Sequence, residues 1–306
     1  MSQVSIASVA PRVTLDTYRA LRLGMVAAGL LLLVSVVLEC LRIGGIPGSI
    51  SATFYSPVRS IFVATLLTVG LALVAIKGRP GWENGLLDIA GLLVPLVAFV
   101  PTPVTLASIA DGATLRYSCP DRGQACVPPE LAADVANNAA AYLVVALVGI
   151  LFVWVRWWRV RSGPAPWHGR TTRAVVVATV LLAAITAWFL LARDSFTNYA
   201  HYTSAITFFV LLIAVVWING RHAQPGQDLL GMTSEGYRRG YYGIALAMTA
   251  AVLAGVATFL ITGEQSGFPV VFWLEVALLL LFIAFWLLQT SEHWNHGQPP
   301  AASVNP

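Results

Sequence analysis

Long apolar segments recur along the chain and are separated by short polar connections. Because a helix advances about 1.5 Å per residue, about 20 apolar residues cross the roughly 30 Å hydrocarbon core of a bilayer. Eight windows meet or approach this requirement, and we predict that each forms a membrane-spanning helix. The windows cover residues 21–39, 61–76, 86–104, 139–158, 174–192, 203–217, 241–261 and 268–288.

The pattern therefore predicts an all-α fold, an integral membrane helical bundle of about eight transmembrane helices. We expect a cytoplasmic N-terminal segment at residues 1–20 and a single membrane domain at residues 21–290. The polar, Pro-rich segment at residues 291–306 is predicted to be a disordered cytoplasmic tail. This organisation leaves no room for a second, soluble domain.

Two windows contain residues that affect helix geometry. Pro95 lies inside the third window and Pro101 and Pro103 lie near its end, so this helix should kink and end early. The seventh window places small residues four apart, which predicts a face for close helix packing. These residues are Gly243, Ala247, Ala251 and Gly255.

Composition and charge indicate the environment and the orientation. Hydrophobic residues make up 58% of the 306 residues and charged residues only 10%, whereas a soluble domain needs a charged surface. With a cytoplasmic N-terminus, thirteen of the 18 Lys and Arg residues fall on the cytoplasmic side, in agreement with the positive-inside rule. We therefore predict a plasma-membrane protein with both termini in the cytoplasm. No compact basic surface indicates nucleic-acid binding.

The longest predicted loop, at residues 105–138, lies on the exterior side and contains Cys119 and Cys126. Pro120 and Gly123 lie between the two cysteines and favour a tight reversal of the chain. Because the exterior is oxidising, we predict a disulfide between them. The third cysteine of the chain lies at the end of the first window and is predicted to be unpaired.

Polar residues within apolar windows are the best indicators of function, because a charge in hydrocarbon is costly unless it is paired or hydrated. Glu275 alone lies well inside a window, about two turns from the outer end of the eighth helix. The predicted topology places further polar residues at the same outer level, namely Glu39, Ser51, Tyr55, Ser56, Arg59, Asp194, His201, Tyr202 and Ser204. Our candidate ligand-binding residues in this layer are Glu39, Tyr55, Arg59, His201, Ser204 and Glu275.

Three interpretations of this layer remain open. In the first, Glu275 pairs with Arg59 or with a tyrosine hydroxyl and only holds helices together. In the second, the layer binds a polar ligand or a lipid headgroup that enters from outside. In the third it is catalytic or holds a metal, for instance with Glu39, His201 and Glu275 around a cation. Asp194 and Ser195, with His201, contain the residue types of a nucleophilic triad, but triads are recognised by geometry rather than by spacing.

The inner half of the bundle shows no comparable layer in the sequence. Glu83 and Asp88 lie at the amino end of the third helix, where the helix dipole favours acids without any function. Lys77 is the single lysine and lies at a helix end, which argues against a retinal Schiff base. The chain also lacks HxxxH and HExxH zinc motifs and a phosphate-binding glycine loop.

Several segments resemble a family of bacterial, largely actinobacterial and proteobacterial, multi-pass membrane proteins of unknown function. The segments read GSISATFYSPVRSIFV at residues 48–63, VAFVPT at 97–102, HYTSAITFF at 201–209 and FWLE at 272–275. They include five of the six candidate residues, and the resemblance covers most of the chain. A more distant resemblance is to the Frag1/DRAM-like membrane proteins. Neither resemblance implies an activity.

The chain is also comparable with the ceramidase-like and adiponectin-receptor-like membrane hydrolases. Those proteins bind zinc through three histidines, whereas His201 is the one candidate histidine here, which argues against a zinc hydrolase of that type. We therefore predict binding or transport of a small polar or lipid-like ligand at an outward-facing polar layer. An outward-facing membrane-embedded hydrolase or lipid-modifying enzyme is the first alternative, and a structural partner subunit is the second. The identity of any cofactor or metal, and whether the protein is an enzyme, stay open at this point.

Overall fold

The computed structural model describes residues 6–79, 82–105, 117–119, 125–160, 169–224, 230–262 and 269–295. The helices of this part of the chain are α1 (Ile6–Ile43), η1 (Ser51–Tyr55), α2 (Arg59–Ala75), α3 (Trp82–Phe99), η3 (Pro129–Leu131), α4 (Ala132–Val160), α5 (Gly169–Leu191), α6 (Arg193–Arg221), α7 (Ser234–Thr262) and α8 (Val270–Glu292). The same residues contain no β-strand, only an isolated antiparallel bridge between Val104 and Cys126. The predicted all-α fold is confirmed.

Seven of the described helices are long and apolar enough to cross a membrane. The remaining α-helix among the described residues, α2, is an apolar helix of 17 residues and corresponds to the second predicted window. At about 1.5 Å per residue it is about 25 Å long, a little less than the hydrocarbon core of a bilayer. These lengths and compositions support the predicted multi-pass membrane protein.

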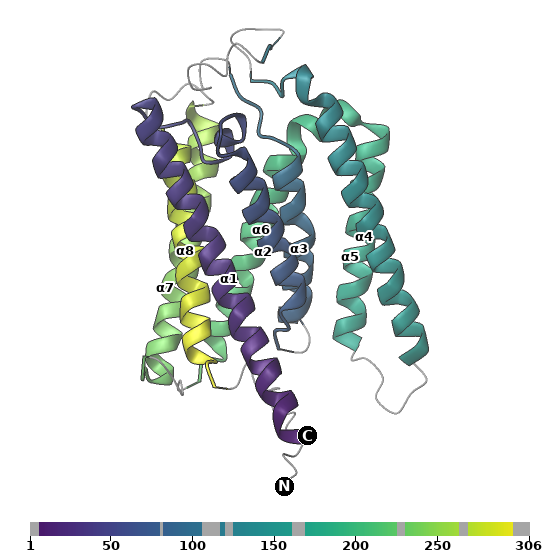
Figure 1. The fold of residues 1–306 in the computed structure, drawn as a ribbon, viewed down its shortest axis with the longest axis vertical. Helices are drawn as coiled ribbons and strands as arrows, with labels where there is room; N and C mark the ends of the chain where they lie inside the picture. Colours follow the sequence, from purple (N-terminus) through teal and green to yellow (C-terminus); the bar gives the residue numbers. More distant parts are fainter. Residues whose placement is uncertain are drawn as a thin grey trace.

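The helices run side by side along the long axis of the molecule, and the start of α1 and the end of α8 lie at the same end of the bundle (Figure 1). We call this end the termini end. The connections α1–α2 and α3–α4 lie at the opposite end (Figure 1). A disulfide between Cys119 and Cys126 closes the α3–α4 connection there, as predicted. We call this second end the disulfide end.

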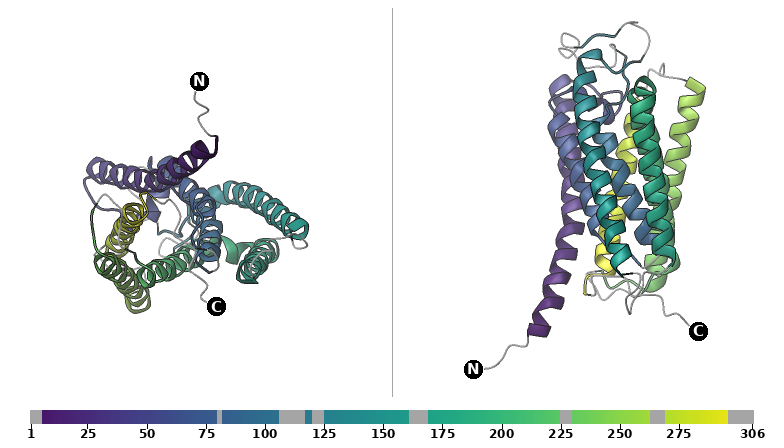
Figure 2. Two further views of the ribbon diagram at one scale, coloured as in Figure 1. Left: turned by 90° about the horizontal axis from the view of Figure 1, so that it is seen from below. Right: turned by 90° about the vertical axis from the view of Figure 1, so that its right-hand side faces the viewer.

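Six helices form a closed ring. The contacts run from α1 to α2, α3, α6, α7 and α8 and back to α1, and the most extensive contact is between α3 and α6. Helices α4 and α5 stand beside the ring and reach it mainly through α3 and α6. The view along the bundle axis in Figure 2 shows this arrangement, with the α4–α5 pair to one side. The sequence gives no indication of which helices are neighbours, so the ring is a result of the structure.

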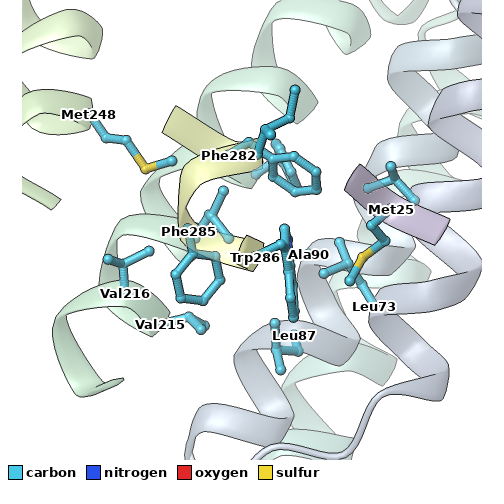
Figure 3. Packing of buried hydrophobic residues seen from close by; sticks show 14 of the residues in the cluster. Met25, Leu73, Leu87, Ala90, Val215, Val216, Met248, Phe282, Phe285 and Trp286 are labelled. Atoms are coloured by element: carbon cyan, nitrogen blue, oxygen red, sulfur yellow. The ribbon is translucent and has the colours of Figure 1, made fainter. Parts of the chain in front are cut away.

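Large apolar side chains fill the middle of the ring. Figure 3 shows Trp286 and Phe285 of α8 facing residues of the surrounding helices. Both aromatic side chains are fully buried, together with Leu87 of α3 and Met25 of α1. A buried aromatic residue removes a large apolar area from its surroundings and makes many dispersion contacts, so this cluster holds the ring together.

Small residues allow α2 and α3 to approach closely. A Cβ atom added at Gly91 would lie 2.7 Å from the carbonyl oxygen of Gly70 and 2.7 Å from a methyl group of Val74. The small-residue face predicted on α7 is formed only in part: Gly243 has no neighbouring atom within 4 Å of its Cβ position, whereas the Cβ position of Gly255 lies 3.4 Å from Leu274 of α8. Helix α7 also packs into the ring with larger side chains, such as the fully buried Tyr241.

The predicted tail boundary was too early. Helix α8 continues to Glu292, and Ser291, Glu292 and His293 are buried. Residues 296–306 of the predicted tail lie outside the described residues. Helix α3 ends at Phe99, before Pro101, as expected from its prolines.

Candidate functional site

Three polar side chains from distant parts of the sequence meet at the disulfide end. The Ser51 hydroxyl donates to Glu275 Oε1 at 2.7 Å, and the Ser51 backbone N–H donates to Glu275 Oε2 at 3.2 Å. The Ser51 oxygen also lies 3.1 Å from His201 Nε2. We refer to Ser51, His201 and Glu275 as the trio. They come from η1, α6 and α8, so the trio joins three elements that are separate in the sequence.

The connection between α1 and α2 is folded so that Ser51 reaches α8. The Ser49 hydroxyl accepts the Ala52 N–H at 2.8 Å, and the Thr53 hydroxyl donates to the Ile50 carbonyl at 2.6 Å. Side chains of this kind stabilise turns because they satisfy nearby backbone groups. Ser51, at the start of η1, is left with its N–H and hydroxyl free to bond Glu275.

His201 is held in place by the end of α3. Its Nδ1 lies 2.8 Å from the carbonyl oxygen of Val100, and only 2% of the side chain is exposed. Carbonyl groups at the end of a helix have no partner within the helix, and Pro101, which follows, prevents its continuation. His201 therefore provides a hydrogen-bond partner for the Val100 carbonyl, which has none within α3.

The hydrogen atoms of the trio can be counted. The Val100 carbonyl only accepts, so Nδ1 of His201 must carry a hydrogen. In a neutral imidazole Nε2 is then an acceptor, and the nearest Glu275 oxygen is an acceptor as well. Ser51 has one hydroxyl hydrogen for these two acceptors. The trio is therefore one hydrogen short when His201 is neutral and Glu275 is ionised.

Tyr55 belongs to η1 together with Ser51, and Ser204 belongs to α6 together with His201, but the Tyr55 hydroxyl bonds outside the trio. The Tyr55 hydroxyl donates to the Thr102 carbonyl at 2.7 Å, and its ring contacts Tyr117 edge to face. Burial raises the pKa of Tyr55 above its ordinary value, so this hydroxyl stays protonated. Ser204 is buried one turn beyond His201 on α6.

Arg59 and Glu39 do not join the trio, so the interpretation that pairs Arg59 with Glu275 is wrong. The Arg59 guanidinium lies 3.0 Å from the Asp134 carboxylate and stacks over the Phe54 ring. The Glu39 carboxylate accepts two hydrogen bonds of 2.7 Å from Arg42. Glu275 makes no ion pair with any residue that the structure describes.

Two other proposed arrangements are not formed. The described residues contain no group of three or more His, Cys, Asp or Glu side chains that could hold a metal ion, so Glu39, His201 and Glu275 do not form one. The Ser195 hydroxyl accepts a hydrogen bond from the Trp188 indole at 3.1 Å, whereas His201 faces Ser51. The triad composition around residues 194–201 therefore has no matching geometry.

A second polar cluster lies at the termini end, where we expected nothing comparable. The Asn219 amide donates to Glu83 Oε1 at 3.2 Å and accepts from Gln289 at 3.3 Å. Arg79 lies 3.8 Å from the Glu83 carboxylate and donates to the His222 carbonyl at 2.9 Å. Asn219 and Gln289 are buried on α6 and α8, the helices that also carry His201 and Glu275.

The end of α8 adds a further buried acid to this region. Glu292 accepts a hydrogen bond from the Tyr241 hydroxyl and another, at 2.7 Å, from the Gln224 backbone N–H. Next to it, Tyr237 and Ser291 share a hydrogen bond of 2.8 Å. The interpretation of Glu83 as a simple helix-dipole acid is therefore incomplete, because its carboxylate is buried and bonded across helices. The feature of the sequence that could have indicated this cluster is the pair of amide residues, Asn219 and Gln289, which follow their apolar windows by only one or two residues.

Comparison with protein-family models, with curated protein sequences and with solved structures gives no match. The resemblance to bacterial multi-pass membrane proteins therefore stays a prediction, and the functional argument depends on the geometry alone.

Proposed function

We propose that this protein binds a small polar or lipid-like ligand at the trio, on the outward-facing side of the plasma membrane. We infer further that the ligand carries N–H or O–H donors, and an amine-bearing headgroup fits best. In this orientation both termini are cytoplasmic and the disulfide end is exterior. The distribution of Lys and Arg and the bonded Cys119–Cys126 pair support it.

The observation that carries the proposal is the state of Glu275. This carboxylate lies in a membrane-spanning helix, about 8 Å from the helix start at 1.5 Å per residue, and most of its side chain is buried. Its described partners are the N–H and hydroxyl of Ser51 and the backbone of Ile50, all of them uncharged, and no cation among the described residues pairs with it. Ionisable groups within membrane spans are paired or functional. A ligand ammonium group supplies the missing charge.

The hydrogen count supports the same chemistry. With one Ser51 hydrogen for two acceptors, the trio is completed by a ligand that brings a further donor. A hydrogen bond to a charged group contributes about 1.5–3 kcal/mol, which corresponds to roughly tenfold or more in affinity. A ligand without N–H or O–H donors does not gain this binding free energy.

The interior of the ring favours binding over transport. Between the trio and the termini end, the helices α3, α6 and α8 contribute apolar side chains such as Leu212, Phe282 and Phe285. Transporters place their polar substrate sites near the middle of the membrane. Among the described residues of α3, α6 and α8, a polar ligand would meet mainly apolar side chains in this layer.

A hydrolase is a second candidate, because one observation favours it. The Val100 carbonyl fixes the His201 tautomer so that Nε2 faces the Ser51 hydroxyl, which is the arrangement of a serine nucleophile and its base. Against it, the same hydroxyl bonds Glu275 at the shorter distance of 2.7 Å. Labelling of Ser51 by a fluorophosphonate probe, lost in His201→Gln, would favour the hydrolase over simple binding.

The binding proposal is tested by thermal unfolding of the purified protein in detergent. Lysophosphatidylethanolamine and lysophosphatidylcholine share a phosphate, but only the ethanolamine headgroup has N–H donors. At about 100 times its Kd, a ligand stabilises the folded state by about 2.7 kcal/mol. We expect the ethanolamine lipid to raise the Tm of the wild type by several degrees and the choline lipid to have a smaller effect.

Variants of the trio show whether the difference in Tm between the two lipids arises there. Glu275→Gln and Ser51→Ala should abolish the difference between the two headgroups. The matched control is Glu235→Gln, since Glu235 is partly exposed at the termini end and pairs with Arg238 and Arg239. The proposal is wrong if both lipids act equally on the wild type, or if Glu275→Gln responds as the wild type does.

A further inference from the structure

A cavity of about 260 Å³ lies between α3 of the ring and the α4–α5 pair. It is partly open to the surroundings of the bundle, and its walls are mostly apolar. The apolar wall is formed by Leu92 of α3, Ala146, Gly149 and Val153 of α4, and Ala174 and Ala178 of α5. The residues of α4 and α5 that line it are small or β-branched, which leaves room beside α3. We refer to this cavity as the groove.

The groove is bounded at two levels. The Tyr142 hydroxyl of α4 donates to the Leu92 carbonyl of α3, which ties the two helices together on the side toward the disulfide end. Trp154 of α4 donates to the Thr179 hydroxyl of α5 at 2.9 Å, which ties these two helices together beside the groove. A Cβ atom added at Gly149, between these levels, would have no neighbour within 4 Å. The space is therefore open where an acyl chain would lie.

The polar residues of the groove all lie at its termini end. Lys77 follows α2, and Asn84 and Asp88 belong to the first two turns of α3. The Lys77 ammonium lies 3.4 Å from the Asp88 carboxylate, and Asn84 donates to the same carboxylate at 3.0 Å. The Asn84 side-chain oxygen is buried and has no hydrogen-bond partner among the described residues. The groove thus has an apolar body and a polar end, as a lipid does.

The charge around the polar end is positive. Arg156 lies one turn beyond Val153 on α4, and Arg173 directly precedes Ala174 on α5. Both arginines are exposed, and the one carboxylate that lines the groove is already paired with Lys77. Basic residues at the level of the headgroups attract anionic lipids, by about 1 kcal/mol each near a membrane surface.

We propose that the groove is a binding site for one phospholipid with an anionic headgroup. One acyl chain lies along Gly149 and Ala178, and the phosphate lies at the termini end near Lys77, Arg156 and Arg173. A glycerol hydroxyl of the lipid headgroup donates to the open Asn84 oxygen. The site is distinct from the trio, which lies at the opposite end of the bundle and involves α6, α8 and η1.

The test is native mass spectrometry of the protein exchanged into nanodiscs that contain equal amounts of phosphatidylglycerol and phosphatidylcholine. We expect one retained lipid per chain, with phosphatidylglycerol favoured at least fivefold. Gly149→Leu fills the groove and should remove this retained lipid. Gly243→Leu is the matched control, because Gly243 on α7 also has no atom within 4 Å of its Cβ position but lies outside the groove.

The role of the basic residues at the polar end is tested separately from the space inside the groove. Lys77→Gln combined with Arg173→Gln should keep a retained lipid but reduce the preference for phosphatidylglycerol to less than twofold. The proposal is overturned if the wild type shows no preference between the two lipids, or if Gly149→Leu retains lipid as Gly243→Leu does. The first of these outcomes is measured on the wild type alone. It therefore overturns the proposal even if the Gly149→Leu protein does not fold.

Discussion

Removal of the Ser51 hydroxyl should destabilise the protein through both of its partners. In Ser51→Ala the Glu275 Oε1 loses its hydrogen bond of 2.7 Å, and the His201 Nε2 loses the hydroxyl oxygen that lies 3.1 Å from it. A buried polar group left without a partner costs about 1–3 kcal/mol, whereas side-chain hydrogen bonds between membrane helices average about 0.6 kcal/mol. His201 is almost fully buried and Glu275 is mostly buried, so we expect a loss of about 1–3 kcal/mol in the free energy of unfolding.

A double-mutant cycle shows whether the trio acts as one unit. The free energy of unfolding is measured by titration with sodium dodecyl sulfate in mixed micelles for the wild type, Ser51→Ala, Glu275→Gln and the double variant. Groups that bond each other show coupling energies of about 0.5–3 kcal/mol, and independent groups add to within about 0.5 kcal/mol. We predict a coupling of about 1 kcal/mol or more between Ser51 and Glu275.

The control cycle replaces Ser51→Ala by Ser49→Ala. Ser49 lies in the same connection but accepts a hydrogen bond from Ala52 within its own turn. Its effect should add to that of Glu275→Gln. If the Ser51 and Glu275 changes also add within about 0.5 kcal/mol, the trio is not an energetic unit and the argument from its hydrogen count fails.

Two further predictions concern the rest of the bundle. Tyr241→Phe removes a hydrogen bond to Glu292 and should lower the free energy of unfolding by about 1–2 kcal/mol, while Tyr242→Phe changes it by less than about 0.5 kcal/mol. Gly91→Ala overfills the α2–α3 contact and should cost about 1–3 kcal/mol. The same substitution at Gly149 meets open space and should stabilise its helix by up to about 1 kcal/mol. Thermal unfolding in detergent checks both pairs, and equal effects within either pair would refute the packing described here.

The sequence was sufficient to predict that the polar residues of the site lie at one level of the bundle. It was not sufficient to predict which of them contact one another. Glu275 and His201 could be found because an ionisable group in an apolar segment is conspicuous. Ser51 could be placed at the same level, yet nothing in the sequence shows that the α1–α2 connection folds over α8. The sequence allowed a pair between Arg59 of α2 and Glu275 of α8 because it does not show which helices are neighbours. In the structure α2 packs against α1 and α3, whereas α8 packs against α1 and α7.

The cluster at the termini end was missed for a different reason. Asn219 and Gln289 are uncharged and follow their apolar windows directly, so each alone is typical of a helix that leaves the membrane. Glu83 lies at a helix start, where an acid needs no explanation. Only the ring arrangement brings these three residues together, because it places the ends of α3, α6 and α8 beside one another.

The most direct test of the trio as a ligand site is the relative affinity for two headgroups. Native mass spectrometry with short-chain phosphatidylethanolamine and phosphatidylcholine gives both Kd values for the wild type, Glu275→Gln and the control Glu235→Gln. We predict that the wild type and the control bind the ethanolamine lipid about tenfold or more tightly than the choline lipid, and that Glu275→Gln binds both equally. The same preference in all three proteins, or no preference in the wild type, would contradict a donor-binding site at Ser51, His201 and Glu275.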